Sequence, residues 1–231
     1  MWRPFVARTG GVAPDLPGFG TSAKPSSGDY SFRALARWLT DYTREMERFS
    51  LVMHDWGGLG LITAMERPEA IERLVLINTV PFLPGYRWHV LARIWRTAVA
   101  GELFMGLSSK WGLARIARMQ ARTKLPDDVV RQATEEIWEH FDQGTQRAIL
   151  RLYRSAPEPV LAEAGRDLGR ITAPALIVWG TEDPYLPSDF GRLYAASLGG
   201  PTELEMVENA GHWPWWEKPH VIERVAAFLA G

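Results

Sequence analysis

Residues 49–60 constrain the fold of this chain more than any other segment. They read FSLVMHDWGGLG, which is an apolar run typical of a strand, then a polar residue, then two glycines that open a helical pattern. A strand that passes so abruptly into a helix predicts a sharp turn, and Asp55 stands in that turn. Its carboxylate is ionised near neutral pH, needs no base to activate it, and forms an alkyl ester when it attacks an sp³ carbon.

Strand and helix patterns alternate on both sides of this turn. A short apolar strand ending in a Pro/Gly turn is predicted over 11–22, and a helix over 31–49 begins at Ser31 as its N-cap. A helix over 57–66 and a strand over 74–77 follow, and the unbroken apolar run of that strand is typical of a parallel sheet buried on both faces. The same alternation returns as strands at 175–178 and 203–207 and helices at 188–198 and 220–229. The pattern predicts an α/β fold with a mostly parallel sheet flanked by helices.

The middle of the chain, residues 82–170, has a different sequence pattern. It shows helical periodicity, no convincing strand and many aromatic residues. We therefore expect a helical cap over 82–170, inserted into a core made of residues 1–81 and 171–231. Such an insertion would roof the carboxyl ends of the strands, where open parallel sheets bind ligands.

Two further polar residues directly follow predicted strands. Asp183 lies in GTEDPYLP after the strand at 175–178, and His212 lies in NAGHW after the last strand. Both are therefore expected at the same edge of the sheet as Asp55. A nucleophile, an acid and a histidine in this chain order, with a glycine-rich turn at the nucleophile, form the α/β-hydrolase arrangement.

Over essentially its whole length the sequence resembles the epoxide hydrolases and haloalkane dehalogenases of the α/β-hydrolase superfamily. Its HDWGG turn is specific to carboxylate nucleophiles, but both groups share it. The matching segments are Asp15 to Ser22 (DLPGFGTS), His54 to Gly58, Asn78 to Phe82, Tyr153-Arg154, Asp183, Gly211 to Trp213, and Glu217 to Pro219.

The resemblance implies a two-step reaction. Asp55 attacks carbon to give an alkyl ester, and His212, oriented by Asp183, activates the water that hydrolyses this ester. The backbone N–H of Trp56 is expected to stabilise the oxyanion that forms on Asp55. Glu182 competes for the role of orienting acid, but Asp183 is preferred because the acid of the family stands third after the glycine that closes the strand.

Tyrosine and indole donors distinguish the two possible leaving groups. An epoxide oxygen needs a proton donor, and Tyr153 resembles the second cap tyrosine of the epoxide hydrolases, although the first is not evident near Phe104 and Tyr86 has to substitute for it. A halide needs N–H donors, which Trp56 or the indoles of Trp88, Trp95 and Trp111 could supply. Epoxide opening is the preferred reading and dehalogenation the alternative. The residues expected to bind substrate or oxyanion are Trp56, Tyr86, Phe104, Trp111 and Trp213, with Trp215 and Trp216 beside Trp213 as a pocket wall.

The resemblance also implies that the early strands of the family, and its His-Gly-x-Pro loop with a second oxyanion N–H, are missing before Trp2. We expect the resulting gap in the sheet to close by direct pairing of the flanking strands or by support from a second copy in a homodimer. A third reading follows, in which the chain is a truncated, impaired homologue that binds small apolar ligands. Losing one oxyanion donor typically costs about 10²–10³ in rate.

The composition and charge of the chain limit the kinds of partner that it is expected to bind. Lys and Arg number 26 against 27 for Asp and Glu, without a long run of one sign, so neither nucleic acid nor a membrane surface is an expected partner. The chain has no cysteine and no apolar stretch of membrane-spanning length, and it reads as cytoplasmic. No metal or cofactor is expected, and a small apolar electrophile and water are the expected substrates. His54 is expected to be structural, and surface or packing roles are expected for His89, His140 and His220.

Overall fold

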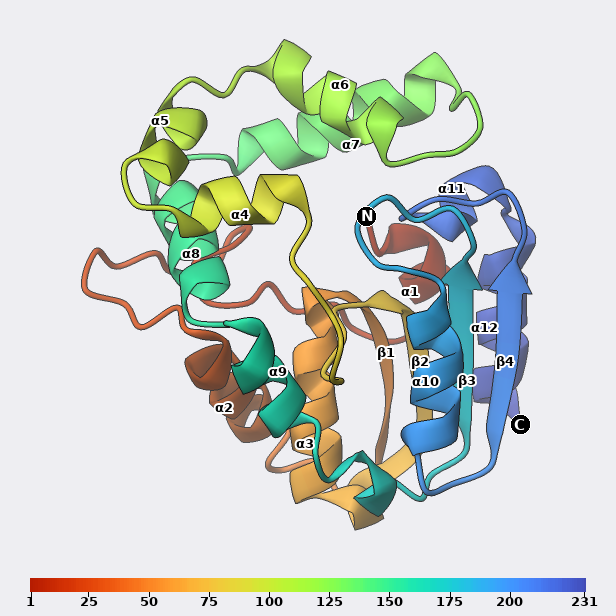
Figure 1. Ribbon diagram of the computed structural model, residues 1–231. Coiled ribbons are helices and arrows are strands. Elements are labelled where there is room, and N and C mark those ends of the chain that lie inside the picture. The colour runs from red at the N-terminus through yellow and green to blue at the C-terminus, as the bar shows by residue number, and fades with distance from the viewer.

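Four parallel strands in the order β1-β2-β3-β4 form the only sheet of the computed structural model, which describes residues 1–231 (Figure 1). The register places Leu76 of β2 opposite Met53 of β1 and Ile177 of β3. The predicted parallel sheet flanked by helices is therefore confirmed. The strands are β1 (Phe49–Asp55), β2 (Ile71–Thr79), β3 (Ala175–Gly180) and β4 (Thr202–Val207).

Helices cover both faces of the sheet because its inner strands are apolar on both sides. Alternate residues of β2 point to opposite faces, so Leu74 and Leu76 join one core and Val75 and Ile77 join the other. The first core also contains residues of α2 (Phe32–Tyr42), α3 (Gly60–Glu66) and α10 (Asp189–Ser197). Residues of α1 (Arg3–Thr9) and α12 (His220–Ala230) complete the second core. None of the helices is both long and apolar enough to cross a membrane.

Residues 82–170, here called the helical insertion, form helices and no strand, as their periodicity predicted. Helices α4 to α7 lie beyond the carboxyl ends of the strands, with α6 and α7 at the top of Figure 1 and α4 and α5 to their left. The insertion comprises α4 (Val90–Arg96), α5 (Ala100–Gly106), α6 (Lys110–Met119), α7 (Asp127–Glu139), α8 (Gln143–Arg154), α9 (Glu158–Ala164) and the 3₁₀ turn η3 (Leu168–Arg170). The other short elements are η1 (Trp56–Leu59), η2 (Pro68–Ala70) and α11 (Pro214–Glu217).

The strand predicted within residues 11–22 is wrong, because this segment forms turns and coil. The side chain of Asp15 stabilises the turn: its Oδ2 accepts hydrogen bonds from the backbone N–H (2.9 Å) and the hydroxyl (3.0 Å) of Thr21. Gly18 and Gly20 adopt positive φ angles of 90° and 52°, which curl the chain where a strand would run straight. β1 is consequently an edge strand, and the expected direct pairing of a strand at 11–22 with it is wrong. The homodimer stays a prediction.

The helix predicted over 31–49 starts at the expected N-cap but ends early. The hydroxyl of Ser31 accepts from the backbone N–H of Ala34, and α2 then stops at Tyr42. The guanidinium of Arg67 donates to the backbone oxygens of Thr43 (2.6 Å) and Met46 (2.7 Å). These carbonyls are satisfied without further helical turns, so the chain can leave the helix for β1.

Candidate active site

Asp55 occupies a strained turn between β1 and η1. Its φ of 48° and ψ of −123° are unusual for a residue with a side chain, and its carbonyl accepts from the backbone N–H of Val80 (3.1 Å). The helix that follows packs tightly against the strand, since a Cβ on Gly60 would lie 2.7 Å from the sulfur of Met53. The turn therefore holds the carboxylate of Asp55 at the carboxyl end of the sheet.

Burial changes the acidity of this carboxylate. Desolvation raises the pKa of Asp55 and the nearby charge of Asp183 adds to the rise, whereas the charge of His212 and a hydrogen bond from the backbone N–H of Trp56 oppose it. A carboxylate that is poorly hydrated and somewhat more basic than usual is a better nucleophile.

Asp183 and His212 form a hydrogen-bonded pair. The Nδ1 of His212 lies 2.8 Å from Oδ2 of Asp183, and Oδ1 of Asp183 accepts from the backbone N–H groups of Tyr185 (2.7 Å) and Leu186 (3.1 Å). Burial acts to raise the pKa of Asp183, but the charge of His212 and these hydrogen bonds outweigh it, so the pKa falls below its ordinary value. Glu182 points elsewhere and pairs with Arg122 at 3.7 Å.

Asn78, at the end of β2, links the carboxylate of Asp183 to the end of β3. Its Nδ2 donates to Oδ2 of Asp183 (2.5 Å), and its Oδ1 accepts from the backbone N–H of Gly180 (2.8 Å). The side chain is fully buried and its backbone has a φ of 39°. Asn78 therefore fixes both the direction of the Asp183 carboxylate and the β3 end from which it projects.

Several backbone and ring contacts hold His212 in place. His54 donates from Nε2 to the carbonyl of His212 (2.8 Å), and the backbone N–H of His212 donates to the carbonyl of Gln120 (2.8 Å). The His212 loop also presses on the Asp183 loop, because a Cβ on Gly180 would lie 2.6 Å from the carbonyl oxygen of Ala210 and closer still to that of Gly211. His54 thus has the structural role expected of it.

The two buried histidines have opposite charge preferences. Burial acts to lower the pKa of His212, but the charge and hydrogen bond of Asp183 and the charge of Asp55 outweigh it and raise the pKa. For His54, burial and the nearby charge of His212 lower the pKa far below its ordinary value. The neighbouring carboxylates therefore favour the charged form of His212, while His54 stays neutral.

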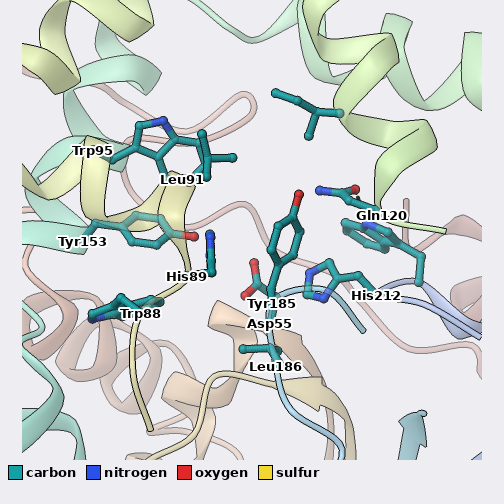
Figure 2. A pocket seen from close by; sticks show the side chains of 12 residues that line it. Asp55, Trp88, His89, Leu91, Trp95, Gln120, Tyr153, Tyr185, Leu186 and His212 are labelled. Atoms are coloured by element: carbon teal, nitrogen blue, oxygen red, sulfur yellow. Dashed lines mark hydrogen bonds between the residues drawn. The ribbon is translucent and has the colours of Figure 1, made fainter. Parts of the chain in front are cut away.

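Asp55 and His212 face a common cavity of about 110 Å³ (Figure 2). The end of β1 and the loop after β4 supply Asp55 and His212, and the helical insertion supplies most of the apolar wall of the cavity. Tyr153 of α8 contributes its ring, and its hydroxyl points inward in Figure 2. The lining residues are Asp55, Trp88, His89, Leu91, Trp95, Ile116, Gln120, Tyr153, Tyr185, Leu186, His212 and Trp213.

The substrate-binding residues expected from the sequence divide into two groups. Trp213 lines the cavity, and its indole N–H donates to Oε1 of Gln120 (2.7 Å). Tyr86 does not line it: this side chain is buried against Trp88 and Phe190, and its hydroxyl has no partner. The remaining expected wall residues also lie outside the cavity: Phe104 packs on Trp95, Trp111 is 75% exposed, Trp215 packs on Phe5, and Trp216 stacks on Trp213.

The cavity also contains residues that the sequence did not single out. His89 is among them: it packs against Tyr185, as a packing residue would, and also lines the cavity. Tyr185 and Gln120 face the same space. Their positions depend on how α4 and α6 pack over the loops, which no local pattern specifies. For Tyr185 alone a signal existed, since it stands two residues after Asp183.

Comparison with known proteins establishes the family. The model of the alpha/beta hydrolase family matches residues 1–225, and the chain therefore belongs to this family. The chain is 31% identical over 228 residues to a haloalkane dehalogenase of Mycobacterium marinum, which covers 94% of this chain and 74% of that protein. It is 26% identical over 235 residues to 2-hydroxymuconate semialdehyde hydrolase of Pseudomonas putida, covering 95% of this chain and 76% of that protein. Haloalkane dehalogenase DbeA from Bradyrhizobium elkani superposes with a TM-score of 0.79 at 23% identity, covering 100% of this chain and 85% of that chain.

Replacing Asn78 by alanine is expected to lower the free energy of unfolding by about 1–3 kcal/mol, because the carboxylate of Asp183 and the N–H of Gly180 lose a buried partner. Urea denaturation measures this loss. Asn209→Ala is the matched control, since Asn209 also has a positive φ (54°). Equal losses in the two variants would attribute the effect to backbone conformation instead of the hydrogen bonds.

Proposed function

We propose that this chain hydrolyses small epoxides to vicinal diols through an alkyl ester on Asp55. One observation carries the proposal: the hydroxyl of Tyr153 points into the cavity that Asp55 and His212 line (Figure 2). A nucleophile, a proton donor for the leaving oxygen and a base for water are thereby available to a single small molecule. Membership of a hydrolase family supports this reading.

In the first step, a carboxylate oxygen of Asp55 attacks a ring carbon of the epoxide. The C–O bond breaks, its electron pair stays on the oxygen, and the Tyr153 hydroxyl delivers a proton to it. Burial, with the added effect of the Asp55 charge, raises the pKa of Tyr153 well above its ordinary value. The phenol is therefore protonated when substrate arrives. The product is a β-hydroxyalkyl ester of Asp55.

In the second step, His212 removes a proton from water, whose oxygen attacks the carboxyl carbon of Asp55. The oxyanion that forms is stabilised by the backbone N–H of Trp56. Collapse of this intermediate releases the diol oxygen, which takes the proton from His212. The regenerated carboxylic acid of Asp55 ionises, and its proton restores the hydroxyl of Tyr153. The sum is one epoxide and one water converted to one diol.

Ester formation itself prepares His212 for the second step. The negative charge of Asp55 is one of the causes that raise the pKa of His212 in the free protein. The ester carries no charge, so this contribution disappears and the pKa of His212 falls. The imidazole is thus more readily neutral, and able to act as a base, at the moment when water must be activated.

The size of the cavity limits the substrate. Its volume of about 110 Å³ is smaller than the roughly 150 Å³ cavity that holds a benzene molecule in an engineered protein. Short aliphatic epoxides such as 1,2-epoxybutane therefore fit the space better than aryl epoxides do. Aromatic and aliphatic side chains, the tyrosines included, line most of it, which favours apolar substrates.

Dehalogenation is the second candidate. The indole N–H groups of Trp56 and Trp95 are buried without an acceptor, and such donors could bind a halide ion. Relatives of the chain include haloalkane dehalogenases. We rank this reaction second because both indole nitrogens are closed off from the cavity surface, whereas the Tyr153 hydroxyl faces it.

Paired assays separate the candidates. The wild-type chain is expected to convert 1,2-epoxybutane to its diol faster than it releases bromide from 1-bromobutane. Tyr153→Phe is expected to slow diol formation by about 10²–10⁴, the usual contribution of a positioned acid, and to change bromide release much less. Prompt bromide release without diol formation would establish dehalogenation instead. Binding of both compounds without turnover would support the impaired homologue.

A further inference from the structure

The ring of His89 is held by one nitrogen and leaves the other free. Its Nδ1 accepts from the backbone N–H of Ala92 (3.2 Å), so His89 is the N-cap of α4. An acceptor nitrogen carries a lone pair and no proton. The neutral ring must therefore carry its proton on Nε2, and Nε2 has no hydrogen-bond partner in the protein.

The surroundings of His89 keep it neutral. Burial lowers its pKa to about 4, and the nearby charge of His212 acts in the same direction, while Asp183 partly opposes it. Protonation of Nδ1 would also break the N-cap of α4. Across the neutral pH range, His89 is consequently an uncharged N–H donor.

The donor faces the reaction cavity. His89 lines the same space as Asp55, and its ring packs against that of Tyr185, with centroids 4.4 Å apart. In Figure 2 His89 stands between Tyr153 and Tyr185. The cavity therefore offers a second donor on the side from which Tyr153 reaches the substrate.

We propose that His89 binds the leaving atom: its Nε2–H donates a hydrogen bond to the epoxide oxygen while Asp55 attacks the neighbouring carbon. This role rests on the proposed function. His89 keeps its proton throughout, and Tyr153 remains the group that transfers one. Two hydrogen-bond donors, Tyr153 and His89, thus stabilise the negative charge that develops on the epoxide oxygen, as the donors of an oxyanion hole do.

The test measures the alkylation step alone, in a His212→Gln background that cannot complete the second step. Intact mass spectrometry follows the growth of the 1,2-epoxybutane adduct on Asp55. His89→Asn places an acceptor near the Nδ1 position, keeps the cap, and removes the Nε2 donor. His89→Gln places an amide nitrogen near the Nε2 position and loses the cap. We expect His89→Asn to slow adduct formation by about 10²-fold, the usual cost of one lost donor, and His89→Gln to slow it much less.

Each outcome assigns the failure to one claim. If His212→Gln alone forms no adduct, the proposed function fails and the role of His89 fails with it. If that background forms the adduct and His89→Asn forms it equally fast, only the role of His89 is overturned. Slowing by His89→Gln but not by His89→Asn, with a lower unfolding temperature in His89→Gln alone, would show that His89 acts only as a helix cap.

Discussion

Asp55→Ala is expected to lower the rate of diol formation from 1,2-epoxybutane by at least about 10⁴-fold, because no other group in the cavity can form the ester. Gas chromatography of the diol measures the rate. The fold is expected to survive, since burial raises the pKa of Asp55 and the ionised side chain therefore weakens the folded state at neutral pH. An unfolding temperature at least equal to that of the wild type at pH 7 checks this point.

Asp55→Asn is the matched variant, since it preserves shape and removes only the charge. It should be equally inactive when assayed fresh, before the amide can hydrolyse back to aspartate. A rate within about tenfold of wild type in either variant would mean that another residue, or water acting directly, opens the ring.

His212→Gln is expected to abolish turnover and yet leave Asp55 reactive. Glutamine cannot accept a proton from water, so the ester forms and persists. The intact mass should rise by the mass of one 1,2-epoxybutane, and fragmentation should place it on the peptide that contains Asp55. Diol formation should fall by at least about 10⁴-fold.

The control for this experiment is the double variant Asp55→Ala/His212→Gln, which should gain no mass under the same conditions. Adduct on both proteins would reveal nonspecific alkylation of surface carboxylates or histidines. Continued turnover by His212→Gln would contradict its role as the base and direct attention to His54, the other buried imidazole beside the site.

The sequence predicted those parts of the site that follow directly from strands. Asp55, Asp183 and His212 each stand at or after the end of a predicted strand, and a parallel sheet brings such positions to one edge. Asn78 belongs to the same edge, but its hydrogen bonds to Asp183 and Gly180 depend on a buried geometry that the sequence does not encode locally.

The remaining differences have physical causes outside local sequence patterns. Residues 11–22 carry an apolar run without a neighbouring strand to pair with, and the side chain of Asp15 satisfies a turn instead. Helix α1 is short and depends on Phe5, which is buried against Trp215 from the other end of the chain. His89 caps α4, and histidine is outside the residues that usually signal a helix start.

The close backbone contact at Gly180 holds the loops of Asp183 and His212 together independently of the residues that shape the substrate cavity. The loops that carry Asp183 and His212 meet at Gly180 without intervening side chains. We therefore expect Asp183 and His212 to keep their relative positions when residues of the cavity wall are substituted. Leu91, Trp95 and Ile116 line the cavity. Substitutions at these three positions are expected to change the range of substrates without moving Asp183 or His212. Position 180 offers no such freedom, since even one methyl group would force the two loops apart.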